Sequence, residues 1–367
     1  MKHRKLISFA LIPLIAFGLI FGSLQKKPLV SLVKAKTNPE KVPEYSSIKL
    51  IDFPFKVVPL EGPFLTFTPK LTQQKRNDQF RPLCGNKSIL NILVAGIDYW
   101  GDDYLYGLAD SIRIIRVDFR THEVSVLTLE RAIWVEIPGI SDHYGITHHN
   151  LNMAYLYGVP AMGYYDGQNG GAGLLAETLK LNLGIDIDNY LVVGMEAFAE
   201  GIDILGGIDV YLPQEVVGDF GEPGSEYYQT LGYFPPGLNH LDGQRTLDLS
   251  RIRMGYSTIF RNQNQDRIFK GIFQKVLSPG TILRLPELVQ LWKDSVLTNI
   301  TPDQIGSMIC LVSRMRSSDL SFTSIPKEYY IETWNTDPAL ESPVDGFNVD
   351  FEFFRKYINK FLNGQIP

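Results

Sequence analysis

Three apolar runs decide the fold of this chain: NILVAGID (residues 91–98), GLADSIRIIRVDF (107–119) and EVSVLTLER (123–131). The first run belongs to a stretch at 88–97 without polar alternation, which is typical of a strand covered on both faces. The strands expected at 112–119 and 123–129 are separated by three residues, so they predict an antiparallel hairpin.

A lone aspartate stands at one end of each of the first two strands. Asp98 follows the first strand, Asp110 precedes the second, and Arg131 leaves the third. If these strands are neighbours, both carboxylates lie at one rim of the sheet. Carboxylate, phosphate and water oxygens are the ligands that Mg²⁺ prefers. We therefore expect Asp98 and Asp110 to hold Mg²⁺.

Composition excludes several classes of protein. The net charge is −5 and charged residues make up 20% of the 367 residues, whereas a nucleic-acid partner requires a basic face. Two cysteines, Cys84 and Cys310, exclude a disulfide framework and a Cys₄ zinc site. One disulfide and two separate buried thiols both remain open.

The N-terminus predicts a membrane anchor. Lys2, Arg4 and Lys5 precede an uncharged apolar run at 6–24, which as a helix reaches about 28 Å, the thickness of the bilayer core. The basic flank places the rest of the chain outside the cytoplasm. A cleaved signal peptide is the alternative, but LQKK after Ser23 is a poor cleavage site. We expect a single-pass protein of the cell membrane.

The remaining chain alternates between helices and strands. Helices are predicted at 152–157, 174–183, 196–205, 241–249, 262–277, 286–296, 301–315 and 350–361, and strands at 190–193, 208–212 and 321–325. The order strand, helix, Gly206–Gly207, strand at 190–212 predicts a βαβ unit. The sheet is therefore expected to be mixed and helix-covered. Residues 250–254 are expected to be extended.

Arginines on the C-terminal side could complete the site. Arg251 and Arg253 alternate on the expected extended run, and Arg261 and Arg267 flank the start of the next helix. Guanidinium groups offer a planar fork to phosphate and stabilise charge during phosphoryl transfer. From spacing alone, four arginines within seventeen residues are more often a solvated surface.

Several motifs in order resemble the LytR–CpsA–Psr family of extracytoplasmic cell-wall ligases. The resemblance covers residues 88 to about 280. Its motifs are NILVAGID (91–98), GLADSIRIIRVDFRTHEVSVLTLERAIWVEIPG (107–139), LNMAYLYG (151–158), NYLVVGMEAFAEGIDILGGIDVYLP (189–213) and LDGQRTLDLSRIRM (241–254).

The resemblance implies an α-β-α sandwich that moves a glycopolymer from a polyprenyl-pyrophosphate carrier onto peptidoglycan, with Mg²⁺. By position, Asp98 and Asp110 would hold the metal. The residues expected to contact the pyrophosphate are Arg131, Arg251, Arg253, Arg261 and Gln265. The helices at 174–183 and 196–205 would line a lipid slot, although an ordinary core stripe explains them equally well.

The domain organisation follows from the same reading. We expect a basic tail at 1–5, the anchor at 6–24, a linker with short strand-like pieces at 25–85, the catalytic-type domain at 86–280 and a helical extension packed on it at 281–367.

Three positions depart from the family pattern. Tyr99 and Trp100 stand where the family has an arginine, Ala132 replaces an acidic residue, and Asn264 replaces a second arginine. These departures favour the alternative of an inactive member that binds polyprenyl phosphates or wall polymer. Hydrolysis of the pyrophosphate, with water as the acceptor, is a third interpretation.

Overall fold

The computed structural model describes residues 84–85, 87–101, 103–219, 231–252, 258–284, 287–288, 290–291 and 295–365. The predicted basic tail, the anchor and almost all of the linker lie outside these ranges, as do Arg253 and much of the helix expected at 286–296. Within the described ranges, no helix combines the length and apolar character needed to cross a membrane.

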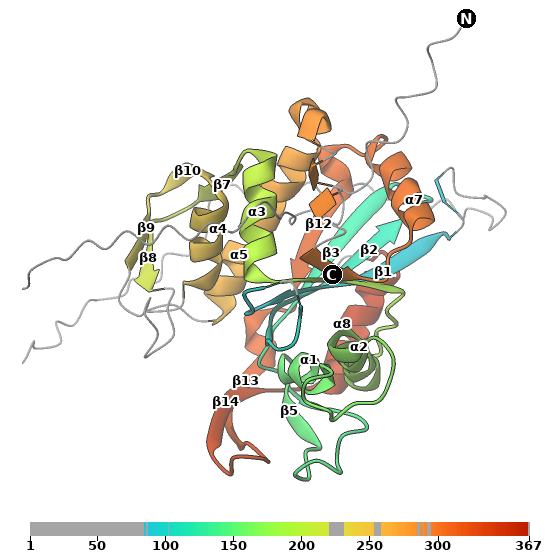
Figure 1. The fold of residues 1–367 in the computed structure, drawn as a ribbon, viewed down its shortest axis with the longest axis vertical. Coiled ribbons are helices and arrows are strands. Elements are labelled where there is room, and N and C mark those ends of the chain that lie inside the picture. Colours follow the sequence, from blue (N-terminus) through green and yellow to red (C-terminus); the bar gives the residue numbers. More distant parts are fainter. Residues whose placement is uncertain are drawn as a thin grey trace, which may run out of the picture. The chain divides into compact units, whose positions relative to one another are not determined.

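A six-stranded mixed sheet forms the centre of the fold (Figure 1). Its order is β11-β6-β1-β2-β3-β12. The strands are β1 (Ile89–Ile97), β2 (Ala109–Asp118), β3 (Glu123–Leu129), β6 (Asn189–Val193), β11 (Val296–Thr298) and β12 (Leu320–Ser324). The pairs β1–β2, β2–β3 and β6–β11 are antiparallel, while β1–β6 and β3–β12 are parallel. The predicted hairpin of β2 and β3 is therefore present.

Alternating side chains of the central strands build two separate cores, one on each face of the sheet. On β1, Ile92 and Val94 belong to one core, while Leu93 and Ala95 belong to the other. This period of two is what a strand covered on both faces requires. Both sets are buried and apolar, which explains why β1 shows no polar alternation.

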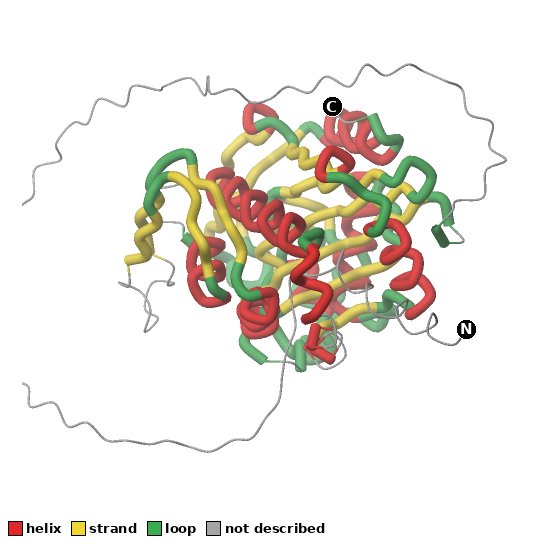
Figure 2. The backbone as a smooth tube through the Cα atoms, turned by 90° about the horizontal axis from the view of Figure 1, so that it is seen from above, coloured by secondary structure: helices red, strands yellow, loops and turns green. Residues whose placement is uncertain are grey.

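Helices cover both faces of the sheet (Figure 2). The first core contains residues of α3 (Met195–Leu205), α4 (Gly243–Arg251), α5 (Thr258–Val276) and α7 (Pro302–Val312). The second contains residues of α1 (Met153–Gly158), α2 (Gly170–Leu183) and α8 (Phe351–Leu362). The short 3-10 helices are η1 (Pro279–Arg284), η2 (Ser317–Asp319) and η3 (Lys327–Tyr329). The predicted mixed α/β fold is confirmed.

Four two-stranded sheets lie outside the central one. They pair β4 (Trp134–Glu136) with β5 (His148–Asn150), β7 (Ile208–Leu212) with β10 (Gly237–Leu241), β8 (Val216–Asp219) with β9 (Leu231–Phe234), and β13 (Tyr330–Thr336) with β14 (Pro343–Val349). The predicted βαβ unit is therefore wrong, because β7 pairs with β10 instead of joining β6. Asp209 and Tyr211 on β7 are exposed, whereas a strand inside a parallel sheet is apolar on both faces.

Helix boundaries differ from the prediction where glycine or short polar residues begin a helix. α2 starts at Gly170, four residues before the predicted start. A Cβ on Gly171 would lie 2.6 Å from the carbonyl oxygen of Tyr155. Glycine there permits close packing of α1 on α2. α4 runs through Arg251, so Ser250 and Arg251 are helical and the predicted extended run is wrong at these residues.

The segment at 281–367 is more than a helical extension. It supplies β11 and β12 to opposite edges of the central sheet, and it also forms the β13–β14 hairpin and α8. The predicted strand at 321–325 matches β12, and the helix expected from Asp350 is α8, with Asp350 as its N-cap. The segment therefore completes the same sheet.

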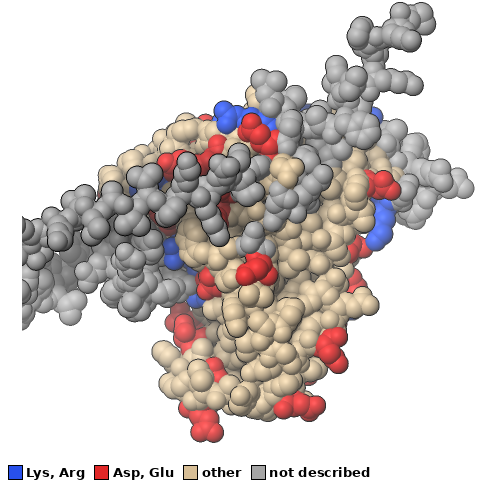
Figure 3. Space-filling model, in the orientation of Figure 1, with Lys and Arg blue, Asp and Glu red and all other residues tan. Residues whose placement is uncertain are grey.

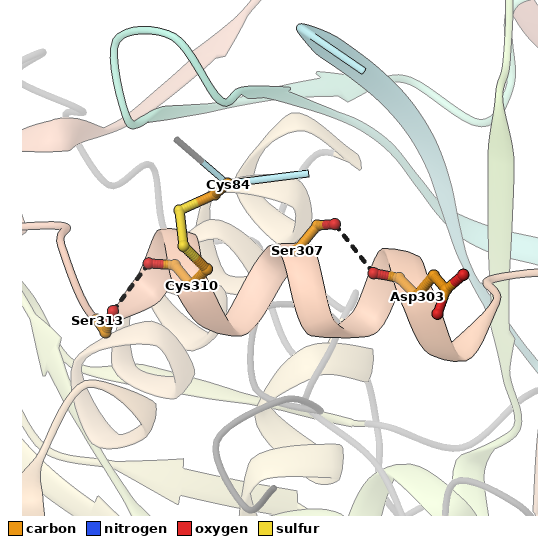
Figure 4. Close-up of a disulfide and its surroundings, with 5 residues drawn as sticks. All are labelled: Cys84, Asp303, Ser307, Cys310 and Ser313. Atoms are coloured by element: carbon orange, nitrogen blue, oxygen red, sulfur yellow. Dashed lines mark hydrogen bonds between the residues drawn. A yellow bond between two sulfur atoms is a disulfide. The ribbon is translucent and has the colours of Figure 1, made fainter. Parts of the chain in front are cut away.

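Cys84 and Cys310 form a disulfide (Figure 4). The bridge joins residues 226 positions apart and fixes the start of the described chain to α7. Thr301 caps this helix with Gln304 in a reciprocal capping box, as the Thr-Pro sequence predicted. Of the two possibilities left open for the cysteines, the structure contains the disulfide.

Candidate active site at the rim of β1 and β2

The pairing of β1 with β2 brings Asp98 and Asp110 to one rim of the sheet. Gly96 is opposite Ser111, and Ile97 is opposite Ala109 after a shift in register. The backbone N–H of Asp98 donates to the Leu108 carbonyl at 3.2 Å, and Asp98 Oδ1 accepts from the Leu108 N–H. This reciprocal pair closes the loop between the strands and holds both aspartates at its base.

Asp110 is the centre of a charged cluster. Its Oδ1 accepts from Arg131 Nη1 at 2.5 Å and from Asn152 Nδ2 at 3.2 Å. Its Oδ2 accepts from Arg261 Nη1 at 3.2 Å, while Arg261 Nη2 donates to the Asp110 carbonyl at 3.4 Å. The Arg261 side chain is only 2% exposed, against 18% for Arg131. Charge-assisted hydrogen bonds of this kind are the strong ones.

The two aspartates interact electrostatically. Desolvation of its carboxylate raises the pKa of Asp98, and the negative charge of Asp110 adds to this effect. The hydrogen bond from Leu108 and the positive charge of Arg131 oppose the shift. A cation bound beside the two carboxylates would relieve this repulsion.

The carboxylates of Asp98 and Asp110 are a donor set that fits Mg²⁺ when phosphate and water supply the remaining ligands. In the described part of the chain, no group of three or more His, Cys, Asp or Glu side chains is arranged to hold a metal. Asp98 is exposed, and no hydrogen bond between described residues engages its Oδ2. Mg²⁺ commonly binds through one or two carboxylates plus substrate phosphates.

Of the other predicted arginines, the structure describes Arg251 but not Arg253. Arg251 is half-buried at the end of α4, and no hydrogen bond or ion pair between described residues joins it to Asp110. Arg253 lies outside the described residues. The proximity of Arg251 instead favours the charged form of Asp248, whose pKa is raised overall by burial.

Gln265, which is predicted to contact the pyrophosphate, bonds two protein groups in this structure. Its Oε1 accepts from Arg113 Nη1 at 3.4 Å, and its Nε2 donates to the Ser250 carbonyl at 3.1 Å. The side chain is buried and ties α5 to the end of α4. Both polar ends are thus engaged by the protein itself.

A second ion pair, between Arg113 of β2 and Asp266 of α5, lies in the interior of the fold. Arg113 is fully buried and pairs with Asp266 Oδ1 at 2.9 Å, which also accepts from Thr128 at 2.7 Å. The Arg113 guanidinium lies 4.6 Å from the centre of the Phe269 ring. An arginine inside the apolar run of β2 is the sequence signal for this buried pair.

Two asparagines also bond to this region, one to Asp110 and the other to the residue before Arg131. Asn152, at the start of α1, donates directly to Asp110, and Asn262 Nδ2 donates to Glu130 Oε2 at 2.8 Å. Glu130 is buried and directly precedes Arg131, so this bond connects the end of β3 to α5 beside Arg261. The LNMAYLYG motif contains Asn152, whereas nothing in the sequence pattern marks Asn262.

Comparison with known proteins agrees with this geometry. Residues 66–342 match the LytR_cpsA_psr family. The chain belongs to the LytR–CpsA–Psr family. It is 26% identical over 263 residues to the polyisoprenyl-teichoic acid–peptidoglycan teichoic acid transferase TagU of Oceanobacillus iheyensis, covering 71% of this chain and 73% of TagU. The predicted family is confirmed, and with it the prediction of a transferase-type enzyme.

Solved structures share the fold of this LytR–CpsA–Psr protein. The crystal structure of Bacillus subtilis TagV matches with a TM-score of 0.58 and 23% identity, covering 76% of this chain and 98% of TagV. A structure of TagT bound to LIIa-WTA matches with a TM-score of 0.53 and 17% identity, covering 79% and 94% of the two chains.

The three departures from the family motifs have distinct surroundings. Trp100 is 50% exposed. Ala132 is buried, and its carbonyl accepts from the Phe347 N–H at 2.8 Å, so the β14 strand docks there. Asn264 is fully buried, and its Oδ1 accepts from Arg267 Nη1 at 2.7 Å. Arg267 therefore bonds within its own helix instead of reaching Asp110.

Proposed function

We propose that this chain is a phosphotransferase that moves a glycopolymer from a polyprenyl-pyrophosphate carrier onto peptidoglycan at the outer face of the cell membrane. The observation that carries the proposal is the cluster in which Asp110 bonds both Arg131 and Arg261 beside Asp98. Two arginines converging beside two carboxylates match a magnesium pyrophosphate, because the arginines suit the anion and the carboxylates suit the metal.

Two further observations support the substrates and the compartment. The relative TagU is named for the transfer of polyisoprenyl-linked teichoic acid to peptidoglycan, and TagT has been solved with LIIa-WTA. The Cys84–Cys310 disulfide suits an oxidising compartment, in agreement with an anchor at 6–24 that leaves the remainder outside the cytoplasm.

The side chains divide the work of the proposed reaction. Arg131 and Arg261 bind the pyrophosphate oxygens and stabilise the charge on the departing polyprenyl phosphate. Asp98 and Asp110 hold the metal, which when bound supplies a Lewis acid for the phosphoryl group. Asp98 Oδ2 accepts the proton of the attacking peptidoglycan hydroxyl. The new bond joins that oxygen to the sugar-linked phosphorus, and the bond from this phosphorus to the polyprenyl phosphate breaks.

A second candidate is a non-catalytic binder of polyprenyl phosphates or wall polymer. Asn264 favours it, because a neutral amide bonded to Arg267 stands where the family motif has an arginine. Each lost charge-assisted hydrogen bond is worth roughly 1.5–3 kcal/mol. Such a loss lowers the rate of transfer while leaving the anion-binding cluster of Arg131 and Arg261 in place.

The two candidates differ in whether polyprenyl phosphate is released. The full-length protein in detergent is mixed with a polyprenyl-pyrophosphate-linked sugar and Mg²⁺, and release is followed over time. The proposal expects release that stops in Asp98→Ala. Release should persist in the control variant Asp103→Ala, because in the wild-type protein the Asp103 carboxylate accepts from the Tyr99 hydroxyl. Lipid binding without release by the wild-type protein would establish the binder instead.

A further inference from the structure

An open pocket lies where β4 and β5 meet the end of β13, the end of β14 and the start of α8. Its volume is about 550 Å³, within the usual range for small-molecule sites. Its lining includes Trp134, Thr147, His148, Thr336, Asn348 and Phe351. None of the described residues that line it is Lys, Arg, Asp or Glu.

The pocket has an apolar floor and a polar rim. Trp134 and Phe351 are half-buried, whereas Thr147, His148 and Asn348 are exposed. An aromatic ring offers large contact area at low entropic cost, and hydroxyl and amide groups offer adaptable hydrogen bonds. A pyranose ring has the matching character, with apolar C–H faces and hydroxyl groups around its edge.

The described lining contains no Lys or Arg to pair with an anionic ligand, which favours an uncharged one. In the orientation of Figure 1, the strands β5, β13 and β14 lie in the lower part of the fold. On the face shown in Figure 3, this part carries scattered acidic side chains and no visible basic ones.

The wall of the pocket is held in place from behind. The Trp134 ring lies 5.4 Å from the buried His149 ring. His149 Nδ1 accepts from the Asn150 N–H at 2.8 Å, so Nε2 carries the proton and donates to Asp337 Oδ2 at 3.1 Å. Burial raises the pKa of Asp337, but hydrogen bonds from His149 and the backbone lower it overall. A preorganised wall loses little entropy on binding.

The chain connects this pocket directly to the proposed active site. Trp134 lies three residues after Arg131 in the chain, beyond a turn at Arg131 and Ala132. The backbone N–H of Asn152 donates to the Arg131 carbonyl at 3.0 Å, and that of Phe347 donates to the Ala132 carbonyl at 2.8 Å. The strands that line the pocket are therefore anchored beside the arginine cluster.

We propose that this pocket is a subsite for uncharged saccharide units of a glycan substrate, with Trp134 under a sugar ring and Asn348 on its polar groups. The inference deepens the proposed function and rests on it for the identity of the glycan. Saccharide binding itself requires neither Mg²⁺ nor a pyrophosphate, so it is measured separately from transfer.

The test measures binding of chitotetraose, a neutral N-acetylglucosamine tetramer, to the full-length protein in detergent by calorimetry and saturation-transfer NMR. Trp134→Ala is expected to weaken binding at least about 10-fold, whereas Trp134→Phe retains most of it because an aromatic face remains. Asn348→Ala removes one neutral hydrogen bond and is expected to weaken binding about 5-fold. Trp334→Ala is the matched control, since Trp334 is 74% exposed and lies outside the pocket lining.

The outcomes separate this inference from the proposed function. Chitotetraose binding that depends on Trp134 and Asn348, and that persists in Asp110→Asn, supports the subsite even if transfer is absent. No saturable binding by the wild-type protein would overturn it. Equal loss in Trp134→Ala and Trp334→Ala would also overturn it, and unchanged binding in both Trp134→Phe and Asn348→Ala would contradict the assigned contacts.

Discussion

Asp110 on β2 and Arg261 on α5 are paired at 3.2 Å across 151 positions of sequence. Arg261 is almost fully buried, so its guanidinium is fixed beside the rim before any substrate arrives. Asp110 also bonds Arg131 from the opposite side. The cluster is thus preorganised, and phosphate oxygens can replace the carboxylate as partners of the two arginines without moving either helix or strand.

Arg261→Lys is expected to lower turnover about 10- to 100-fold with a small change in unfolding midpoint. Lysine keeps the charge but loses the planar fork, which removes a charge-assisted hydrogen bond of roughly 1.5–3 kcal/mol. Arg267→Lys is the matched control on the same helix, because Arg267 bonds Asn264. Steady-state release of polyprenyl phosphate checks this, and an equal decrease in both variants would contradict the assigned role of Arg261.

Arg113→Met is expected to lower the free energy of unfolding by about 3 kcal/mol. The substitution removes the partner of Asp266 from a buried ion pair, and such losses typically cost 3–5 kcal/mol. Partial exposure of Asp266 places the expectation at the lower end. Urea unfolding of Arg113→Met, Asp266→Asn and the double variant gives the coupling energy. A coupling energy near zero would show that the pair contributes nothing to stability.

Cys310→Ser is expected to destabilise the protein by about 2–4 kcal/mol, because the bridge to Cys84 restricts the unfolded chain. Urea unfolding with and without a reducing agent checks this. The reductant should lower the midpoint of the wild-type protein to that of Cys310→Ser and leave the variant unchanged. A wild-type midpoint that does not respond to full reduction would rule out a stabilising role.

Asp118 predicts a specific loss of stability in acid. Burial raises the pKa of Asp118, but hydrogen bonds from Arg120 and Arg116 outweigh this and lower it from 3.8 to about 2. The contribution of ionised Asp118 to the free energy of unfolding is therefore present above pH 4 and disappears as the pH falls toward 2. It amounts to about 1–2 kcal/mol after allowance for the exposed Arg120. The stability difference between wild type and Asp118→Asn should vanish over that window, and a constant difference would contradict the pairing.

The sequence predicts the strands of the central sheet better than their partners. β1, β2 and β3 are recognisable because buried strands are continuous apolar runs and the β2–β3 connection is short. β7 shows where this prediction fails. A strand that follows a helix and two glycines is typical of a βαβ crossover, yet β7 pairs with β10. Pairing between distant segments depends on tertiary packing that no local pattern records.

The positions of the charged residues in the candidate site were easier to predict than those of the neutral polar residues. Asp98 and Asp110 end and begin neighbouring strands, and both arrive at the same rim. The position of Arg261 was also informative, because arginine in a buried helix face requires an acidic partner. The contact of Gln265 with the Ser250 carbonyl could not be predicted, since an amide bonds a substrate or a protein carbonyl equally well and the packing of α4 on α5 decides.

The most direct test of the proposed transfer follows one labelled glycan through the whole reaction. Full-length protein in detergent is incubated with Mg²⁺, peptidoglycan and a polyprenyl-pyrophosphate-linked glycopolymer labelled in its sugar. The wild-type protein should move label onto peptidoglycan and release an equal amount of polyprenyl phosphate. Asp110→Asn should be at least about 100-fold slower while still binding the lipid, as expected for loss of an electrostatic contact at the reacting group. Transfer by Asp110→Asn at the wild-type rate, or lipid binding by the wild-type protein without transfer, would contradict the account.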